Sequence, residues 1–151
     1  MPCRGRVKIF SVDEAEETLP LVRRITQDLT AEYPRWRTAV ADYEILSGGA
    51  KADNGETDEL LSARQNVMTH AERINECLRE LEQVGCVFKG FENGLVDFYA
   101  LREDRLVFLC WRLGEEHVLH WHEVDTGVSG REPIDDALMF RGSHTEGSAS
   151  P

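Results

Sequence analysis

The feature that most constrains the fold is an apolar stripe that continues at helical spacing from residue 15 to residue 43. Its members follow one another at steps of three and four, as residues on one face of an α-helix do: they are Ala15, Leu19, Val22, Ile25, Leu29, Tyr33, Trp36, Val40 and Tyr43. Before the stripe, Ser11 and Glu14 have the spacing of a capping box, in which each side chain bonds the other residue's backbone N–H. The sequence therefore predicts a long helix that begins after Ser11. Because proline lacks the N–H that an interior turn needs, we expect a kink or short break near Pro34 and a smaller bend at Pro20.

A second helical stripe follows a segment of turn-like composition. Residues 47–57 contain three glycines together with Asp53 and Asn54, which favours a flexible connection. The second stripe again uses steps of four and three: Leu60, Arg64, Val67, Ala71, Ile74, Leu78 and Leu81. It stops at Gly85, a residue suited to the left-handed position after a helix. The two stripes predict an antiparallel helical hairpin. Both helices are long for so thin a stripe, so we expect another copy of the chain to cover part of the apolar face.

The chain then changes to runs of β-branched and aromatic residues. Residues 96–101, 106–113 and 118–124 are such runs, separated by charged and glycine-containing turns, and they predict an antiparallel meander. Residues 8–10 are expected to add a short edge strand. Residues 106–111 are apolar on both faces, as in a central strand that is covered on both sides. The predicted fold class is α+β, with the long hairpin packed on a small three- to four-stranded antiparallel sheet. One domain is expected over residues 1–134, followed by a disordered tail, rich in Ser and Gly, over residues 135–151.

Composition excludes several classes of function. The chain of 151 residues has 28 acidic and 17 basic residues, which leaves a formal charge of −11 and disfavours binding to nucleic acid or to an anionic membrane. No apolar run approaches the length of a membrane helix, and the N-terminus lacks the apolar stretch of a secretory signal, so we expect a cytoplasmic protein. The four cysteines form no CxxC pair, which argues against a zinc knuckle or a disulfide scaffold. None of the GxGxxG, P-loop, GxSxG or HExxH signatures occurs, so no residue is assigned a catalytic role and enzymatic activity stays open.

The first predicted strand pair allows an argument about register. If Leu101 pairs with Leu106 across the four-residue turn, Asp97 lies opposite Cys110, and Arg112 lies one step away on the diagonal. An aspartate inside an apolar strand is costly to bury unless it is paired. We therefore predict an Asp97–Arg112 ion pair. The plainer interpretation is a structural contact at the end of the sheet, because buried ion pairs are more often structural than catalytic.

The third predicted strand carries histidines whose side of the sheet depends on the length of the preceding turn. His120 and His122 share one face of a strand. A three-residue turn would place Cys110 opposite His120 and bring both histidines to the face of Asp97. A two- or four-residue turn would place them behind the sheet.

If these groups meet, they offer ligands for a metal. Asp97, His120 and His122 would supply oxygen and nitrogen ligands to a divalent transition metal, and Glu115 or Glu123 would add a carboxylate. The plainer alternative is a histidine that is hydrogen-bonded within the sheet or solvated at its edge.

Other candidate residues have structural interpretations that are simpler. Aromatic residues at strand spacing, including Trp111, are usually core residues. Cys110 lies in an apolar run, where a thiol is usually inert. Glu115 is interpreted as a solvated turn residue, and Arg131 as part of a turn in which it is tied back to a carboxylate.

Short blocks of sequence stand in a characteristic order: Phe10 with Glu14-Ala15, Leu19-Pro20, Gly85-Cys86, Gly94-Leu95-Val96-Asp97-Phe98, Cys110-Trp111-Arg112-Leu113-Gly114-Glu115, Trp121-His122-Glu123 and Gly130-Arg131-Glu132-Pro133. Over residues 7–134 these blocks resemble the prokaryotic proteins grouped as domain of unknown function 2203. The resemblance implies no activity, because that family has no established biochemical role. It implies that six residues match the family's motif positions: Asp97, Trp111, Arg112, Glu115, His122 and Arg131. His117 and His120 match none, so the resemblance favours Asp97 with His122 as the metal pair and the other motif residues as ligand contacts.

Two functional hypotheses follow. The first is a structural or interaction module that self-associates through the helical stripe as a homodimer or a larger homo-oligomer. The second is a protein that binds a small ligand or a divalent transition metal, and that is an enzyme if the site performs chemistry. Its polar site would lie on the sheet around Asp97, Arg112 and His122.

Overall fold

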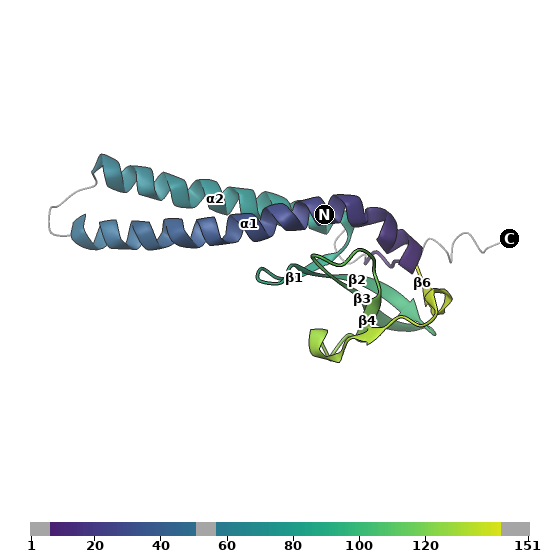
Figure 1. Cartoon of the computed structure of the whole chain (residues 1–151). Helices are drawn as coiled ribbons and strands as arrows, with labels where there is room; N and C mark the ends of the chain where they lie inside the picture. Colours follow the sequence, from purple (N-terminus) through teal and green to yellow (C-terminus); the bar gives the residue numbers. More distant parts are fainter. Residues whose placement is uncertain (1–6, 51–56, 143–151) are drawn as a thin grey trace.

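The computed structural model describes residues 7–50 and 57–142, and its longest elements form the predicted antiparallel hairpin (Figure 1). Helix α1 covers Val12–Ala50 and helix α2 covers Asp58–Val84. Of the predicted connection over residues 47–57, residues 47–50 belong to α1, and residues 51–56 lie outside the described residues.

Both helices begin on local signals in the sequence, and α2 also ends on one. The capping box is confirmed, because the Ser11 N–H donates to Glu14 Oε1 at 2.9 Å and the Glu14 N–H donates to Ser11 Oγ at 3.1 Å. Thr57 caps α2 by accepting from the Leu60 N–H at 3.1 Å. Gly85 ends α2 at φ 104°, a left-handed conformation that glycine adopts at low cost, as predicted.

The break expected near Pro34 is absent, because α1 continues through both prolines. Pro20 and Pro34 are exposed. The carbonyls that lose a helical N–H partner can therefore bond water, and the long helix on either side supplies the remaining hydrogen bonds.

The sheet has six antiparallel strands, which corrects the prediction of three to four. The strands are β1 Val87–Gly90, β2 Leu95–Arg102, β3 Arg105–Arg112, β4 His120–Glu123, β5 Glu132–Pro133 and β6 Phe140–Arg141. Strands β1 to β5 lie in chain order, and β6 pairs with β2. The meander β2–β3–β4 was predicted. The two-residue strands β5 and β6 come from a segment of irregular composition, in which no periodicity marks them.

The predicted edge strand over residues 8–10 does not form. The Phe10 N–H donates to the Tyr99 carbonyl at 2.7 Å, but the edge strand beside β2 is β1, which follows α2 directly. Within the segment 135–151, where a disordered tail was expected, residues 137–139 form a short 3-10 helix and Phe140–Arg141 pair with β2. Residues 143–151 lie outside the described residues.

The hydrophobic core lies between the hairpin and one face of the sheet (Figure 1). Along β3, residues 107–111 are all buried, which confirms a central strand covered on both sides. Neighbouring residues of a strand point to opposite faces. Trp111 and Leu109 belong to the core on the hairpin side, so Cys110 and Phe108 face the other side. We call that second side the outer face of the sheet.

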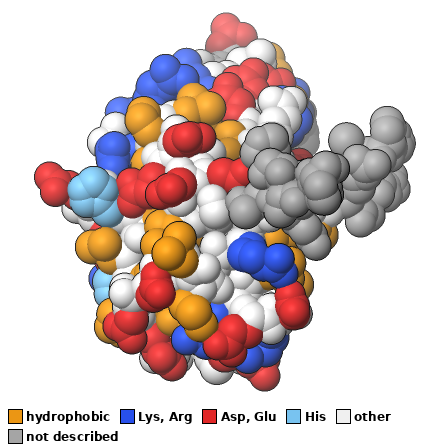
Figure 2. Space-filling view, turned by 90° about the vertical axis from the view of Figure 1, so that its right-hand side faces the viewer, with side chains coloured by type: hydrophobic (Ala, Val, Ile, Leu, Met, Phe, Trp, Pro, Cys, Tyr) orange, Lys and Arg blue, Asp and Glu red, His pale blue; other side chains and the backbone are white. Residues whose placement is uncertain are grey.

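The hairpin extends well past the sheet (Figure 1). The point of departure is marked by Tyr33 on α1, whose ring stacks on Phe91 of the β1–β2 turn with centroids 4.2 Å apart. We call the projecting part, residues 34–48 and 58–69, the distal hairpin. At the opposite end of the molecule, acidic, basic and hydrophobic side chains are interspersed over the described part of the surface (Figure 2).

Candidate functional site

Three strands bring Asp97, Cys110 and His122 together on the outer face; we call this group the sheet site. Asp97 on β2 lies opposite Cys110 on β3, which confirms the predicted register. Cys110 in turn lies opposite His120 on β4, and Phe108 lies opposite His122. The histidines therefore share the face of Asp97, and the open question of turn parity is answered in favour of a common site.

The residues of the sheet site are almost completely buried and close together. Asp97 and His122 are each 2% exposed and Cys110 is 1% exposed. His122 Nε2 lies 3.1 Å from Asp97 Oδ2, and one oxygen, one sulfur and one nitrogen of the three residues lie within 4.8 Å of one another. The predicted pair of Asp97 and His122 is thus in direct contact. Cys110, interpreted from the sequence as an inert core thiol, is the third member.

A hydrogen bond from the ring nitrogen Nδ1 fixes the orientation of the His122 ring. Nδ1 lies 2.7 Å from the Glu123 carbonyl oxygen, which can only accept, so Nδ1 carries a proton and donates it. Nε2 faces the Asp97 carboxylate. A carboxylate and an unprotonated imidazole nitrogen are both acceptors, so a positively charged species or a proton must lie between them.

Burial dominates the electrostatics of the sheet site. Burial raises the pKa of the Asp97 carboxyl, and the charges of His122 and Lys89 with hydrogen bonds from His122 and Cys110 counteract only part of this rise. Burial, with the neighbouring charge of Asp97, also raises the pKa of the Cys110 thiol to about 12. Without a metal, Cys110 is therefore protonated at neutral pH and is a poor nucleophile.

The predicted Asp97–Arg112 ion pair is wrong. Among the described residues, Asp97 forms its ion pairs with His122 and with Lys89, whose Nζ lies 3.7 Å from Asp97 Oδ2. Lys89 comes from β1, a strand that sequence periodicity did not indicate, at a shift of register between Phe88 and Gly90. Arg112 stands at the end of the sheet, where its side chain is exposed.

A second polar group lies beside the sheet site and is centred on Arg131. Its Nη2 atom lies 2.9 and 3.0 Å from the two carboxylate oxygens of Glu115 and 2.8 Å from His120 Nδ1. The same atom is 3.5 Å from the carbonyl oxygen of Cys110, so the two groups adjoin. Arg131 is thus tied back to a carboxylate, as predicted, and that carboxylate belongs to Glu115, which was interpreted as a solvated turn residue and is half-buried.

Trp111 does not join either polar group. It is completely buried on the hairpin side of the sheet, where the guanidinium of Arg23 lies 5.8 Å from its ring. Its indole Nε1–H donates to the Glu115 carbonyl at 2.9 Å. This position confirms the interpretation of Trp111 as a core residue.

Comparison with known proteins identifies the family. A family model described as "Uncharacterized conserved protein (DUF2203)" matches residues 8–134. The chain belongs to the DUF2203 family. Neither the curated proteins nor the solved structures contain a match to it. Within its described part, this DUF2203 protein has no helix that combines the length and the apolar character needed to span a membrane.

The hairpin of this DUF2203 protein carries a buried ion pair that the sequence analysis missed. The side chain of Glu32 on α1 is 8% exposed and contacts His70 Nδ1 on α2. Arg35 lies 3.3 Å and Arg73 3.6 Å from its carboxylate oxygens. The available signal was the position of Glu32, three residues after Leu29 on the apolar stripe.

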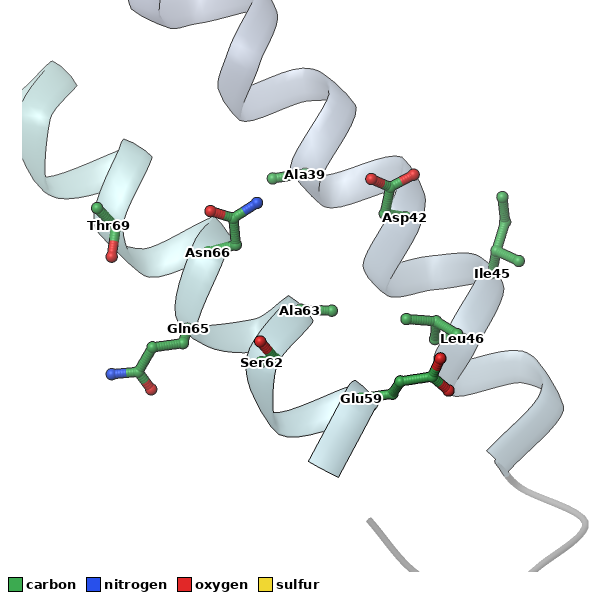
Figure 3. Close-up of a pocket in the computed structure, with 10 residues that line it drawn as sticks. All are labelled: Ala39, Asp42, Ile45, Leu46, Glu59, Ser62, Ala63, Gln65, Asn66 and Thr69. Carbon is green, nitrogen blue, oxygen red and sulfur yellow. The ribbon is translucent and has the colours of Figure 1, made fainter. Parts of the chain in front are cut away.

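The distal hairpin of the DUF2203 protein contains a groove of about 650 Å³ between its helices (Figure 3). Ala39 and Leu46 of α1 and Ala63 of α2 line it, and Asp42 and Glu59 stand at its sides. Ile45 also lines the groove and is 73% exposed. This groove combines apolar and acidic groups away from the sheet.

Proposed function

We propose that this protein is a self-associating module, in which the distal hairpin packs against the distal hairpin of a second copy. The observation that carries the proposal is the small core of that region. Within residues 34–48 and 58–69, only Ala39 and Leu60 are buried apolar residues. The preceding part of α1, over residues 12–33, buries six apolar side chains: Val12, Ala15, Leu19, Val22, Ile25 and Leu29.

Helix pairs need a partner layer to bury their apolar faces. Most of the stability of a helix in a protein comes from packing of such a face, and two helices alone enclose little volume between them. In the distal hairpin, Ile45 is 73%, Met68 55% and Leu61 41% exposed. These exposures support association, because the apolar surface of these side chains is removed from water only when another layer covers it.

The occupant that best fits this surface is a second copy of the same hairpin. Two hairpins together make a four-helix bundle, an arrangement in which the helices cover one another's apolar faces around a shared core. A two-fold axis would place the groove lined by Ala39, Leu46 and Ala63 against its equivalent, since the same patch contacts itself in a symmetric dimer.

Sedimentation velocity and light scattering over a range of micromolar concentrations test the proposal. We expect a dimer mass that falls toward the monomer mass on dilution. Replacing Ile45 by lysine should move the equilibrium toward monomer, because a charge would enter the apolar contact.

The matched control is Leu138→Lys, because Leu138 is also an exposed apolar residue, at 88%, but lies in the short 3-10 helix near β6. It should leave the mass unchanged. Circular dichroism checks that both variants keep the helices. A wild-type protein that stays monomeric at every concentration contradicts the proposal, and so does a dimer that Ile45→Lys leaves intact.

A further inference from the structure

The sheet site has a ligand set that the hairpin proposal does not use. One carboxylate, one thiol and one imidazole come from three adjacent strands and meet within 4.8 Å. All three side chains are nearly inaccessible to water. Burying a carboxylate is costly unless it is paired, and the lysine that pairs with Asp97 from β1 is 43% exposed.

The orientation of His122 is the orientation of a metal ligand. A metal-ligating histidine almost always donates its other N–H to a carboxylate or a backbone carbonyl, which fixes the tautomer and the plane of the ring. His122 donates from Nδ1 to the Glu123 carbonyl at 2.7 Å, so the lone pair of a neutral ring would lie on Nε2. Nε2 points at Asp97 Oδ2, 3.1 Å away, and this contact between acceptors requires a positive species or a proton.

The charges also balance for a divalent ion. Asp97 contributes one negative charge, and Cys110 contributes another when it binds as a thiolate, so these two ligands offset the charge of a divalent cation, while the half-exposed Lys89 keeps its Nζ 3.7 Å from Asp97 Oδ2. Metal binding would release the Cys110 thiol proton and the proton shared by His122 and Asp97.

We propose that Asp97, Cys110 and His122 bind one divalent transition metal ion, with zinc as the best match. Zinc takes sulfur, nitrogen and oxygen ligands together in tetrahedral sites, whereas magnesium and calcium take oxygen ligands. Three protein ligands leave one coordination position for water or another donor. Because each ligand lies on a different strand, the ion links β2, β3 and β4 and stabilises the sheet.

Cobalt titration of the full-length, untagged, metal-free protein tests the site. Cobalt(II) reports ligands by its colour, since a thiolate ligand gives a charge-transfer band in the near ultraviolet and tetrahedral geometry gives intense visible bands. We expect one equivalent of Co²⁺ to produce both sets of bands, Zn²⁺ to displace it, and two protons to be released per ion at neutral pH.

Two cysteine-to-serine variants test whether Cys110 is the sulfur ligand. Cys110→Ser should remove the charge-transfer band and weaken binding by more than the roughly 10- to 100-fold that changes to a ligand's hydrogen-bond partner cause. Cys77→Ser should keep the band, because Cys77 lies on α2 and belongs to no cluster of ligands in the described part of the chain. A band that survives Cys110→Ser overturns the proposal.

The zinc-loaded wild-type protein provides a test that does not depend on the folding of a variant. Its X-ray absorption spectrum should require one sulfur ligand, with nitrogen and oxygen atoms completing the shell. A shell without sulfur overturns the assignment. Failure of the metal-free wild type to bind Co²⁺ or Zn²⁺ at millimolar concentration leaves only a proton between His122 and Asp97 and overturns the proposal altogether.

Discussion

Removing His70 should destabilise the hairpin, because His70 is the least exposed ion-pair partner of the buried Glu32 carboxylate among the described residues. The side chain of Glu32 is 8% exposed and that of His70 is 15% exposed, whereas Arg35 and Arg73 are 61% and 57% exposed. Exposed ion pairs contribute about 0–1 kcal/mol, because solvent screens them. A hydrogen bond to a charged group contributes about 1.5–3 kcal/mol. We therefore expect His70→Ala to cost about 2 kcal/mol and Arg35→Ala less than about 1 kcal/mol.

The same carboxylate predicts a dependence on pH. Burial alone would raise the pKa of Glu32, but the hydrogen bonds from His70 and Arg35 and the charges of His70 and Arg73 lower it below the ordinary value of 4.5. A carboxyl whose pKa is lower in the folded state than in the unfolded state stabilises the fold above the unfolded pKa. That contribution is lost as the pH falls from 4.5 through the lowered pKa of the folded protein.

Urea unfolding and thermal unfolding, both followed by circular dichroism, measure the loss of stability and its dependence on pH. At neutral pH, a loss of about 2 kcal/mol corresponds to a melting temperature lower by roughly 4–8 °C for a chain of this size. The difference between wild type and Glu32→Gln should shrink as the pH falls below 4.5. The reasoning is refuted if His70→Ala is no less stable than Arg35→Ala, or if the difference for Glu32→Gln is the same at every pH.

Two further predictions concern backbone features. Gly94→Ala should cost more stability than Gly114→Ala, because both glycines have positive φ but an added Cβ at Gly94 would lie 2.7 Å from the Leu113 Cβ, whereas at Gly114 it meets nothing within 4 Å. Urea unfolding should give roughly 1–3 kcal/mol for the strained backbone in each variant, with an extra loss at Gly94; equal losses would contradict the packing argument. Ser11→Ala should cost about 1 kcal/mol by removing the acceptor for the Glu14 N–H, and an unchanged melting temperature would contradict a stabilising cap.

The strand register was predictable because it depends on local turn chemistry and on a side-chain period of two. The tight turn at Glu103 and Asp104 places Leu101 opposite Leu106, and the predicted pairs along β2 and β3 follow, including Asp97 with Cys110. The start of α1 and the end of α2 were predictable for the same reason, since Ser11 and Gly85 act on their own neighbours.

The partners of Asp97 were not predictable from one strand pair. Lys89 comes from β1 on the other side of β2, and its position depends on a shift of register that no periodicity announces. His122 reaches Asp97 because the connection between β3 and β4 happens to keep Cys110 opposite His120. Cys110 was assigned to the core from its apolar neighbours. This assignment predicted its burial correctly, but it did not specify the face of the sheet to which the thiol points.

Long-range packing also determined the elements that the sequence analysis missed or predicted wrongly. The two-residue strands β5 and β6 exist because longer strands offer them an edge. The helix continues through Pro34 because its exposed side allows water to replace a lost hydrogen bond. Glu32 was overlooked because a carboxylate on an apolar stripe becomes favourable only when the second helix supplies His70.

Hydrogen–deuterium exchange at two protein concentrations tests self-association through the distal hairpin most directly. The proposed dimer predicts that amides in residues 34–48 and 58–69 exchange more slowly in the concentrated sample, while amides of β2 and β3 exchange at the same rate in both. Equal exchange of the distal hairpin at the two concentrations, or slower exchange confined to the sheet, would contradict the account.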